Sequence, residues 1–275
     1  MRSMSLLARL DKLLRPGPRV HVLRLAGPIG LPGRPGLSDE GVADAAEAAF
    51  SGNPSAVALA INSPGGLPVQ SALIAARIRR LAERETIPVF AFCEDMAASG
   101  GYWLACAADE IHADPSSLVG SIGVITASFG AHEALGRLGL ERRVHATGDR
   151  KLILDPFQPE RPEDVEDLRA IQADILAAFL DHVRTRRGDR LKVAPESLGG
   201  ALRTGRRALE EGLVDGLGHL VPVMKARFGD RTRFRVFAPR RGLLTRLGVS
   251  GAAAAATEGA LDALEARLRR PDTGV

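Results

Sequence analysis

Hydrophobic positions along most of the chain fall into short continuous runs that alternate with helical stripes. The apolar runs at residues 20–25, 56–61 and 88–93 are closed or flanked by glycine, proline and serine. Such runs are typical of strands buried on both faces. Helical patterns at 39–50 and 69–83 separate them. This alternation predicts an α/β fold built on a largely parallel sheet.

The second half of the chain continues the alternation with shorter elements. A helix of small residues is expected at 99–108, and a long amphipathic helix at 163–186, where apolar residues recur along one stripe. Short strands are predicted at 110–113, 122–128 and 142–146.

Both ends of the chain differ in character from this central part. Residues 1–18 place five leucines on one helical face and basic residues off it, so they predict an amphipathic helix. It could lie on an anionic membrane surface or pack on the domain or a sister subunit. Residues 238–275 are interpreted as a linker followed by an alanine-rich helix with a leucine stripe. The predicted organisation is therefore 1–18, a domain at 19–237, and 238–275.

Composition narrows the classes of protein that remain. The 275 residues are 45% hydrophobic and 25% charged, which is ordinary for a globular protein, and the net charge of +4 gives no reason to expect a nucleic acid partner. Cys93 and Cys106 lie in apolar surroundings and are expected to be reduced. No apolar run approaches the roughly 20 residues of a membrane span, and charges interrupt the N-terminal leucines. These features predict a cytoplasmic protein, in solution or on the cytoplasmic membrane face.

Ser99 is the first candidate for chemistry, within the segment AASGGYW at residues 97–103. It follows a predicted strand and begins a predicted helix. Glycines there allow a substrate backbone to approach, and the unpaired N–H groups of a helix start can stabilise an oxyanion. The alternative is an ordinary serine N-cap.

A second glycine pair ends another predicted strand, in the segment NSPGG at residues 62–66. Ligands of open α/β sheets gather at the carboxyl ends of strands, where Gly65 and Gly66 could direct N–H groups into a crevice. The same segment could equally form a plain turn.

A nucleophilic serine also needs a base. None of the six histidines stands in a glycine-rich turn that resembles a catalytic one; they are His21, His112, His132, His145, His182 and His219. Lys151 follows a predicted strand, in a chain with four lysines whose other cations are all arginines. Arginine cannot act as a base, whereas a lysine can once burial favours its neutral form. The alternative for Lys151 is a solvated surface residue.

Five segments in this order resemble the signal peptide peptidase A family of serine–lysine peptidases, including its shorter SohB-like members. The resemblance covers roughly residues 20–225. The segments are INSPGG at 61–66, MAASGGY at 96–102, VGSIGV at 119–124, GDRKLILDPF at 148–157, and TGRRA at 204–208 with GLVD at 212–215.

This resemblance implies a ClpP/crotonase-like superhelix of ββα units, with short helical appendages at both ends. It implies that Ser99 is the nucleophile and Lys151 the base, that Gly66 and Gly100 form the oxyanion hole, and that Ser121 orients the lysine. It also implies a homo-oligomer in which a lysine can complete the site of a neighbouring subunit. The implied substrates are unfolded peptides, such as signal-peptide remnants, cut at small or apolar residues. No metal or other cofactor is implied.

Three other functions remain open from the sequence. A crotonase-like acyl-CoA hydratase or isomerase would use carboxylates, for which Glu94, Asp95 and Asp109 are candidates. A ClpP-like Ser-His-Asp peptidase needs a histidine one helix and one strand beyond the serine, and residues 122–125 contain none. A non-catalytic scaffold that binds unfolded peptides is the third.

Overall fold

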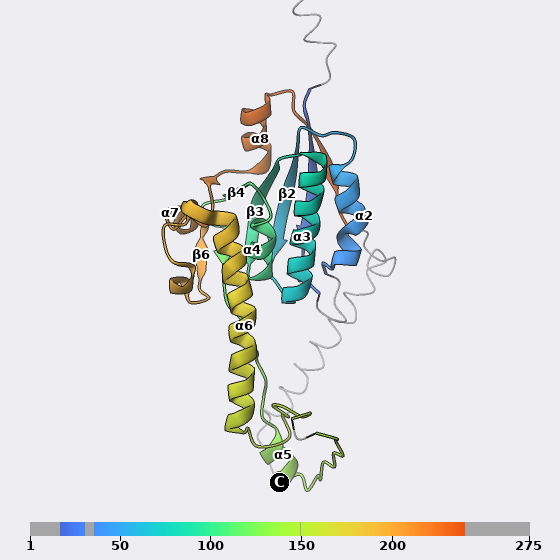
Figure 1. Cartoon of the computed structure of the whole chain (residues 1–275), viewed down its shortest axis with the longest axis vertical. Coiled ribbons are helices and arrows are strands. Elements are labelled where there is room, and N and C mark those ends of the chain that lie inside the picture. Colours follow the sequence, from blue (N-terminus) through green and yellow to red (C-terminus); the bar gives the residue numbers. More distant parts are fainter. Residues whose placement is uncertain (1–16, 31–35, 149, 240–275) are drawn as a thin grey trace, which may run out of the picture.

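The computed structural model describes residues 17–30, 36–148 and 150–239. The predicted helix at 1–18 and the segment 238–275 lie almost wholly outside these residues. Eight strands form one sheet, which includes the first and the last strand of the described chain (Figure 1). They are β1 (Arg19–Ala26), β2 (Ala56–Ser63), β3 (Val89–Ala98), β4 (Glu110–Ala113), β5 (Leu118–Gly120), β6 (Leu202–Thr204), β7 (Gly216–Leu217) and β8 (Arg233–Phe237).

The sheet confirms the predicted parallel arrangement. Its order is β6-β5-β3-β2-β1-β8, with β4 pairing β3 and β7 at the same edge. Every pairing is parallel except that between β5 and β6. The carboxyl ends of β1, β2 and β3 therefore meet at one end of the sheet, where sites in open α/β sheets form.

The helices begin and end where local chemistry dictates. Helix α2 (Asp39–Phe50) has Ser38 as its N-cap, whose hydroxyl accepts from Gly41 N–H. Helix α3 (Pro68–Glu85) begins with a proline in its first turn, where a missing N–H costs nothing. The remaining helices are α4 (Gly100–Ala105), α5 (His132–Arg137), α6 (Pro162–Arg187), α7 (Gly205–Glu210) and α8 (Leu220–Phe228), with single 3₁₀ turns at Gly188–Arg190 and Pro195–Leu198.

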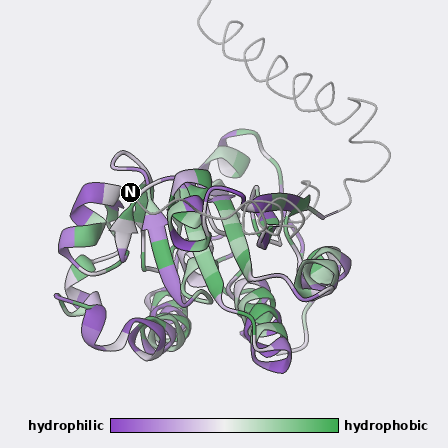
Figure 2. Cartoon of the chain, turned by 90° about the horizontal axis from the view of Figure 1, so that it is seen from above, coloured by the Kyte–Doolittle hydropathy of each residue, from purple (hydrophilic) through white to green (hydrophobic). Residues whose placement is uncertain are grey.

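The two faces of the sheet carry separate apolar clusters. The larger cluster lies under α2, α3 and α4 and includes Leu59, Ile74 and Tyr102, all fully buried. The smaller one lies on the opposite face and packs Val20 and Phe92 against α8. Figure 2 shows the same distribution, with hydrophobic strands inside and hydrophilic positions on the outer helix faces.

Helix α6 projects from the sheet (Figure 1). Residues 121–148 and 150–161, hereafter the arm, leave the sheet after β5 and reach the far end of α6, where α5 lies. The other end of α6 is fixed by Arg187, which is 2% exposed. Its guanidinium donates to both carboxylate oxygens of Asp215, at 2.7 and 2.8 Å, and to the Gly212 carbonyl. No helix among the described residues is long and apolar enough to cross a membrane.

The strands predicted at 122–128 and 142–146 are wrong. The strand near the first of them is β5, which ends at Gly120; beyond it the chain leaves the sheet into the arm. Ile125 is 87% exposed there, so the run of apolar and β-branched residues has no neighbouring strand to pair with.

Candidate active site

Ser99 occupies a sharp turn between β3 and α4. Its backbone has φ 51° and ψ −121°, a conformation that a residue with a side chain rarely adopts. Hydrogen bonds fix the turn on both sides: Ser99 N–H donates to the Gly120 carbonyl at 2.7 Å, and the Ser99 carbonyl accepts from Tyr102 and Trp103 N–H. Surrounding structure that holds a strained residue in this way is common at catalytic positions.

The loop after β2 packs directly against this turn, and only glycine fits there. A Cβ on Gly65 would lie 2.8 Å from the Ala98 carbonyl oxygen, the Gly100 nitrogen and the Ser99 Cβ. A Cβ on Gly101 would lie 2.6 Å from the Ser63 carbonyl oxygen. The two glycine-rich segments singled out from the sequence are therefore in contact.

Two backbone N–H groups beside Ser99 have no acceptor among the described residues. Ile29 N–H donates to the Gly65 carbonyl and Leu67 N–H to the Ile29 carbonyl, each at 2.8 Å, which leaves Gly66 N–H unused between them. Gly100 N–H begins α4 and also has no partner in the described chain. Free donors next to a nucleophile are what an oxyanion hole requires.

Ser99, Gly66, Gly100 and Ser121 all line one pocket of about 930 Å³. Ser121 is brought there by the loop after β5, with φ 52° and its N–H donating to the Ala201 carbonyl at 3.2 Å. Four of the five residues assigned by resemblance therefore lie together.

The wall of the pocket is mainly apolar. It includes Trp103 of α4, Ile122 and Val124, and four residues of α6. Ile175, Leu176 and Phe179 belong to the helical stripe seen in the sequence, and Leu180 lies outside that stripe. Glu196 is the one ionisable residue among the described residues of the lining, and it forms an ion pair with Arg184. No sequence pattern indicated Glu196, because nothing local marks its loop as part of the pocket.

Lys151 is not in this pocket. It is exposed, on the arm, and its segment is tied to the start of α6: Arg150 pairs with Asp167, and Leu154 N–H donates to Asp164 at 3.4 Å. Among the described residues, nothing forms a hydrogen bond or ion pair with the Lys151 amine.

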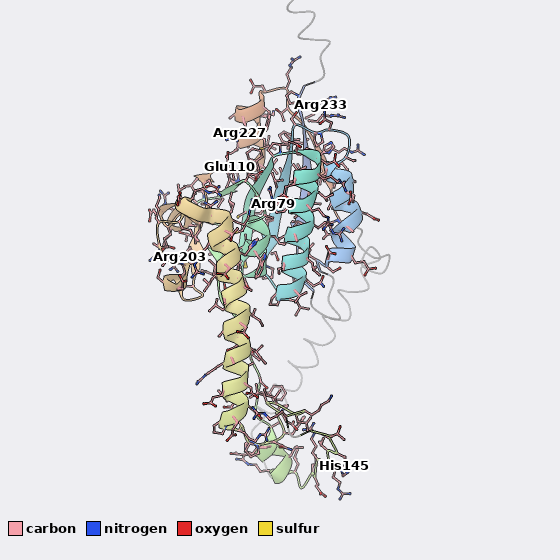
Figure 3. All side chains as sticks on the ribbon, viewed as in Figure 1. Arg79, Glu110, His145, Arg203, Arg227 and Arg233 are labelled. Carbon is pink, nitrogen blue, oxygen red and sulfur yellow. The ribbon has the colours of Figure 1, made fainter. Side chains whose placement is uncertain are left out.

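The separation of Lys151 from Ser99 can be judged along α6. Trp103, four residues after Ser99, stacks on Phe179 with ring centroids 4.7 Å apart. Asp167 and Phe179 are twelve positions apart on the helix, or about 18 Å at about 1.5 Å per residue. Figure 3 shows the arm, marked by His145, at the end of α6 remote from the sheet. One chain alone does not bring this lysine to its own serine.

No histidine lines the pocket in the described part of the chain. His182 contacts one wall of the pocket from outside: its Nε2 lies 3.1 Å from the Trp103 carbonyl oxygen and its ring stacks on Trp103. Burial lowers the pKa of the His182 imidazole, so that it is neutral and structural near pH 7.

The carboxylates considered for acyl-CoA chemistry lie elsewhere. Asp109 accepts from Arg79 and from Val89 N–H, and Glu94 and Asp95 line a separate pocket. No group of three His, Cys, Asp or Glu side chains in the described residues is placed to hold a metal ion.

Comparison with known proteins gives the relatives of this chain. Residues 82–227 match Peptidase family S49. The Na(+)/H(+) antiporter NhaA of Brucella melitensis is 49% identical over 231 residues, 82% of this chain and 31% of that protein. The chloroplastic serine protease SPPA of Arabidopsis thaliana is 32% identical over 72% of this chain and 29% of that protein. A putative signal peptide peptidase SppA of Enterococcus faecium is 31% identical over 59% and 47%. The chain thus spans about a third of the length of the first two.

A solved structure gives the fold. A lysine-to-alanine mutant of the 1510-N membrane-bound stomatin-specific protease, in complex with a substrate peptide, aligns with a TM-score of 0.52 at 14% identity, over 86% of this chain and 99% of that one. The likeness confirms the predicted ClpP/crotonase-like α/β fold. With the strained serine turn, the free N–H groups and the family match together, the chain belongs to peptidase family S49, among the SppA- and SohB-like proteins.

Proposed function

We propose that this protein is a serine endopeptidase in which Ser99 attacks the substrate and Lys151 of a neighbouring copy serves as the base. The observation that carries the proposal is the Ser99 turn, with two unused N–H groups beside it and an apolar pocket in front of it. This is the arrangement that acyl transfer from a peptide to a serine needs.

The base is assigned to a neighbour because of where the arm holds it. Within one chain, Lys151 lies at the far end of α6 from Ser99. The described lining of the Ser99 pocket offers no base other than Glu196, which is paired with Arg184. A neighbouring copy whose arm reaches over this pocket would supply the amine. Ser121, already in the pocket, would then accept a hydrogen bond from it and hold it toward Ser99.

The surface of the arm supports assembly of this kind. It exposes large apolar side chains, including Ile125 (87%), Phe129 (74%) and Leu138 (72%). Apolar surface of this size on one projection commonly marks an interface. We propose that a second copy of the chain covers these side chains. Lys151 on the arm must reach the Ser99 pocket of that copy, and the wall of that pocket is itself apolar.

The mechanism follows from this geometry. Lys151, neutral, accepts the Ser99 hydroxyl proton as the Ser99 oxygen attacks the peptide carbonyl carbon, and Gly66 and Gly100 N–H bind the oxyanion. The tetrahedral intermediate collapses as the lysinium gives its proton to the leaving amine, which forms an acyl-enzyme. Water then attacks the ester carbonyl carbon and gives one proton to the lysine. The lysinium returns that proton to the Ser99 oxygen as the ester bond breaks and the carboxylic acid leaves.

The substrates we propose are unfolded peptides with small or apolar residues at the cut, such as remnants of signal peptides. The apolar wall of the pocket supports this class. The names of two relatives, a serine protease SPPA and a putative signal peptide peptidase, and the substrate peptide in the complex of a structural relative, point the same way. We place the activity in the cytoplasm or on the cytoplasmic membrane face, in keeping with two buried free cysteines.

Mixing two inactive variants tests the proposal. Ser99→Ala and Lys151→Ala should each abolish cleavage of a quenched apolar peptide. Co-assembled at equal amounts, they should regain about a quarter of wild-type activity, since a random neighbour pair joins an intact serine to an intact lysine about one time in four. If activity does not recover after confirmed subunit exchange, the base lies in the same chain as the serine. Full activity in either single variant would show that Ser99 and Lys151 are not a catalytic dyad.

Two further assays separate the alternatives. A fluorophosphonate probe should label Ser99 of the wild type, identified by the mass of its peptide, and should leave Ser99→Ala unlabelled. A pure scaffold would not react. Hydration or isomerisation of an acyl-CoA by Ser99→Ala would instead favour the crotonase-like function.

A further inference from the structure

The described lining of the Ser99 pocket carries a single charged side chain, that of Glu196. The rest of this lining consists of apolar residues, glycines and three hydroxyl residues. The side chain of Glu196 is 48% exposed, so the carboxylate lies where the pocket opens to solvent. A charge beside an apolar wall acts more strongly on a bound molecule than a charge surrounded by water. Glu196 is therefore placed to act on a substrate chain that enters the pocket.

A short 3₁₀ turn, Pro195–Leu198, holds the backbone of Glu196. Both end residues of this turn are buried, and Gly199 N–H donates to the Glu196 carbonyl at 3.3 Å. The chain then reaches Ala201, whose carbonyl accepts from Ser121 N–H at 3.2 Å. The segment that carries Glu196 is thus tied to the loop that brings Ser121 into the same pocket.

The charge of Glu196 is only partly balanced within the fold. Its Oε1 pairs with Arg184 of α6, and its other carboxylate oxygen has no partner among the described residues. Arg184 also donates to Asp181 at 3.0 Å, so one guanidinium serves two carboxylates. Arg184 itself does not line the pocket. The mouth of the pocket therefore keeps a net negative charge and an oxygen that a cation can approach.

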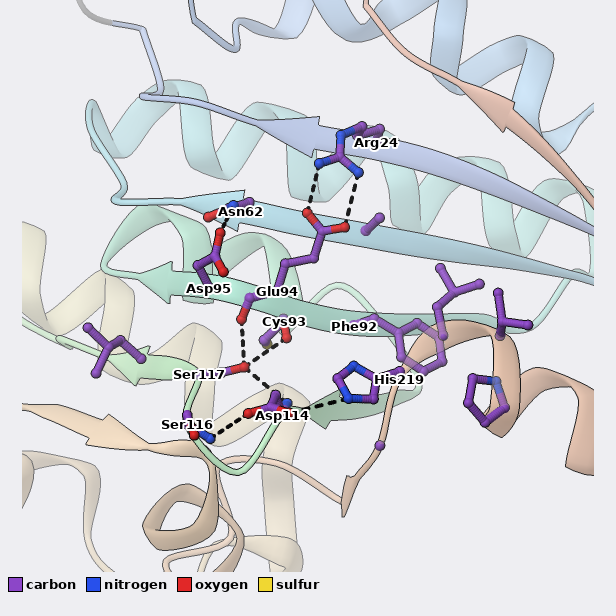
Figure 4. Close-up of a pocket in the computed structure, with 16 residues that line it drawn as sticks. Arg24, Asn62, Phe92, Cys93, Glu94, Asp95, Asp114, Ser116, Ser117 and His219 are labelled. Carbon is purple, nitrogen blue, oxygen red and sulfur yellow. Dashed lines mark hydrogen bonds and ion pairs between the residues drawn. The ribbon is translucent and has the colours of Figure 1, made fainter.

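A second pocket, of about 710 Å³, shows a glutamate whose charge is fully engaged (Figure 4). There Arg24 donates to both carboxylate oxygens of Glu94, at 3.0 and 2.9 Å. The neighbouring Asp95 accepts from Asn62 at 2.6 Å. Of the two glutamates, Glu196 is the one that still has an oxygen free to accept a hydrogen bond from a bound molecule.

We propose that Glu196 selects substrates in which a lysine or arginine lies within a few residues of the cut. This inference rests on the proposed peptidase function. The apolar wall takes the small or apolar side chain, and the free oxygen of Glu196 accepts a hydrogen bond from the ammonium or guanidinium group nearby. An acidic side chain at the same position is repelled. The substrates are thereby narrowed to unfolded peptides in which a cation adjoins an apolar stretch.

Matched quenched peptides test this selection. They share one apolar sequence and carry lysine, leucine or glutamate at one position at a time on either side of the cut. At the best position, the wild type should cleave the lysine peptide with a kcat/KM about fivefold above that of the leucine peptide, as expected for a half-exposed ion pair. The glutamate peptide should be slower still. Glu196→Gln should lower the lysine-to-leucine ratio to about one.

Glu47→Gln is the matched control for this substitution. The side chain of Glu47 is also 48% exposed and also pairs with an arginine, Arg84, but it lies on α2 and does not line the Ser99 pocket. The lysine-to-leucine ratio of this variant should equal that of the wild type.

Each other outcome has a distinct meaning. The same lysine-to-leucine ratio in wild type and Glu196→Gln would overturn the selection by Glu196 and leave the peptidase function standing. Equal losses on all three peptides would also overturn it, because Glu196 would then serve the reaction or the fold. If the wild type cleaves none of the peptides, the peptidase function itself is wrong, and this inference with it.

Charge reversal and salt supply independent readouts. Glu196→Lys should invert the order, so that the glutamate peptide is cleaved about fivefold faster than the lysine peptide. If that variant folds poorly, raising the salt from about 0.05 M to about 1 M should bring the lysine-to-leucine ratio of the wild type toward one, because screening weakens the ion pair. An order that survives charge reversal, or a ratio that does not respond to salt, would contradict selection by charge.

Discussion

The Ser99 turn and the arm that carries Lys151 are the two halves of the proposed active site, and they are built in opposite ways. Around Ser99, glycines in contact and hydrogen bonds on both sides leave the backbone one conformation. The arm exposes several large apolar side chains, and ion pairs of Arg150 with Asp167 and of Arg161 with the buried Asp164 join it to α6. The difference teaches how the proposed mechanism would divide its parts: a single chain preorganises Ser99 and the N–H groups beside it, and assembly would supply the base.

The largest effect is expected from disturbing the serine turn. Gly65→Ala would place a Cβ 2.8 Å from three atoms of the turn, at a φ of 95°. Because the oxyanion donors would shift, kcat/KM should fall by about 100- to 1,000-fold. Gly139→Ala is the matched control on the arm, with φ 65° and open space around the added carbon, and its rate should stay within about threefold. Comparable losses of kcat/KM in Gly65→Ala and Gly139→Ala would show that the Ser99 turn is no more sensitive to an added carbon than the arm.

The second largest effect is expected at the ion pair between Arg187 and Asp215, which fixes one end of α6. This helix lines the Ser99 pocket and is also joined to the arm. Arg187→Met should lower the free energy of unfolding by about 3 kcal/mol, because Asp215, whose side chain is 17% exposed, loses its closest cation and keeps only Arg190 at 3.6 Å. Urea unfolding measures this. Arg207→Met, which removes an exposed ion pair to Glu211, should cost less than about 1 kcal/mol.

The same pair predicts how the stability depends on pH. Burial raises the pKa of the Asp215 carboxyl, but hydrogen bonds from Arg187 and Ile111 N–H outweigh it and hold the pKa below its usual range. The wild-type stabilisation is therefore complete above the unfolded pKa, near 3.9, and is lost as the pH falls through the lower folded pKa. Arg187→Met should lose this acid-dependent component, so the stabilities of the two proteins should converge as the pH falls below the folded pKa of Asp215.

Substitutions on the arm should change oligomer assembly more than they change the free energy of unfolding. Phe129→Ser removes a side chain that is 74% exposed in one chain, so unfolding of the monomer should hardly change. If a second copy covers it, the concentration for half-maximal specific activity should rise about tenfold or more. Val69→Ser on α3, 67% exposed, is the control and should leave that concentration unchanged. The same shift in both variants would mean that the arm has no special part in assembly.

The smallest effect is expected from the ion pair between Arg150 of the arm and Asp167 of α6. Arg150→Gln removes an exposed pair with Asp167, and the stability should change by no more than about 0.5 kcal/mol. Because Lys151 is the next residue, kcat should still fall about two- to fivefold while KM stays constant. A change in KM alone would place this segment in substrate binding instead.

The sequence predicted the parts of the molecule that local patterns determine. The three central strands and the helix 163–186, found as α6 at Pro162–Arg187, follow from apolar periodicity, and the approach of Gly65 to Ser99 was implied by two glycine-rich segments at strand ends. The arm was missed, because residues 122–128 have the composition of a strand and only the lack of a neighbour shows otherwise. Both pockets depend on residues distant in the sequence, such as Phe179 beside Ser99 or Val221 beside Glu94, which no local pattern connects.

The hydrogen bond from Ser99 N–H to the Gly120 carbonyl has one more consequence. Gly120 is the last residue of β5, and the arm starts at the next residue. The nucleophile and the root of the arm are thus a single mechanical unit, joined over one peptide. If the arm docks on a second copy as proposed, a displacement of its first residues would reach the Ser99 backbone through this one hydrogen bond, so docking of the arm and the orientation of Ser99 would be coupled.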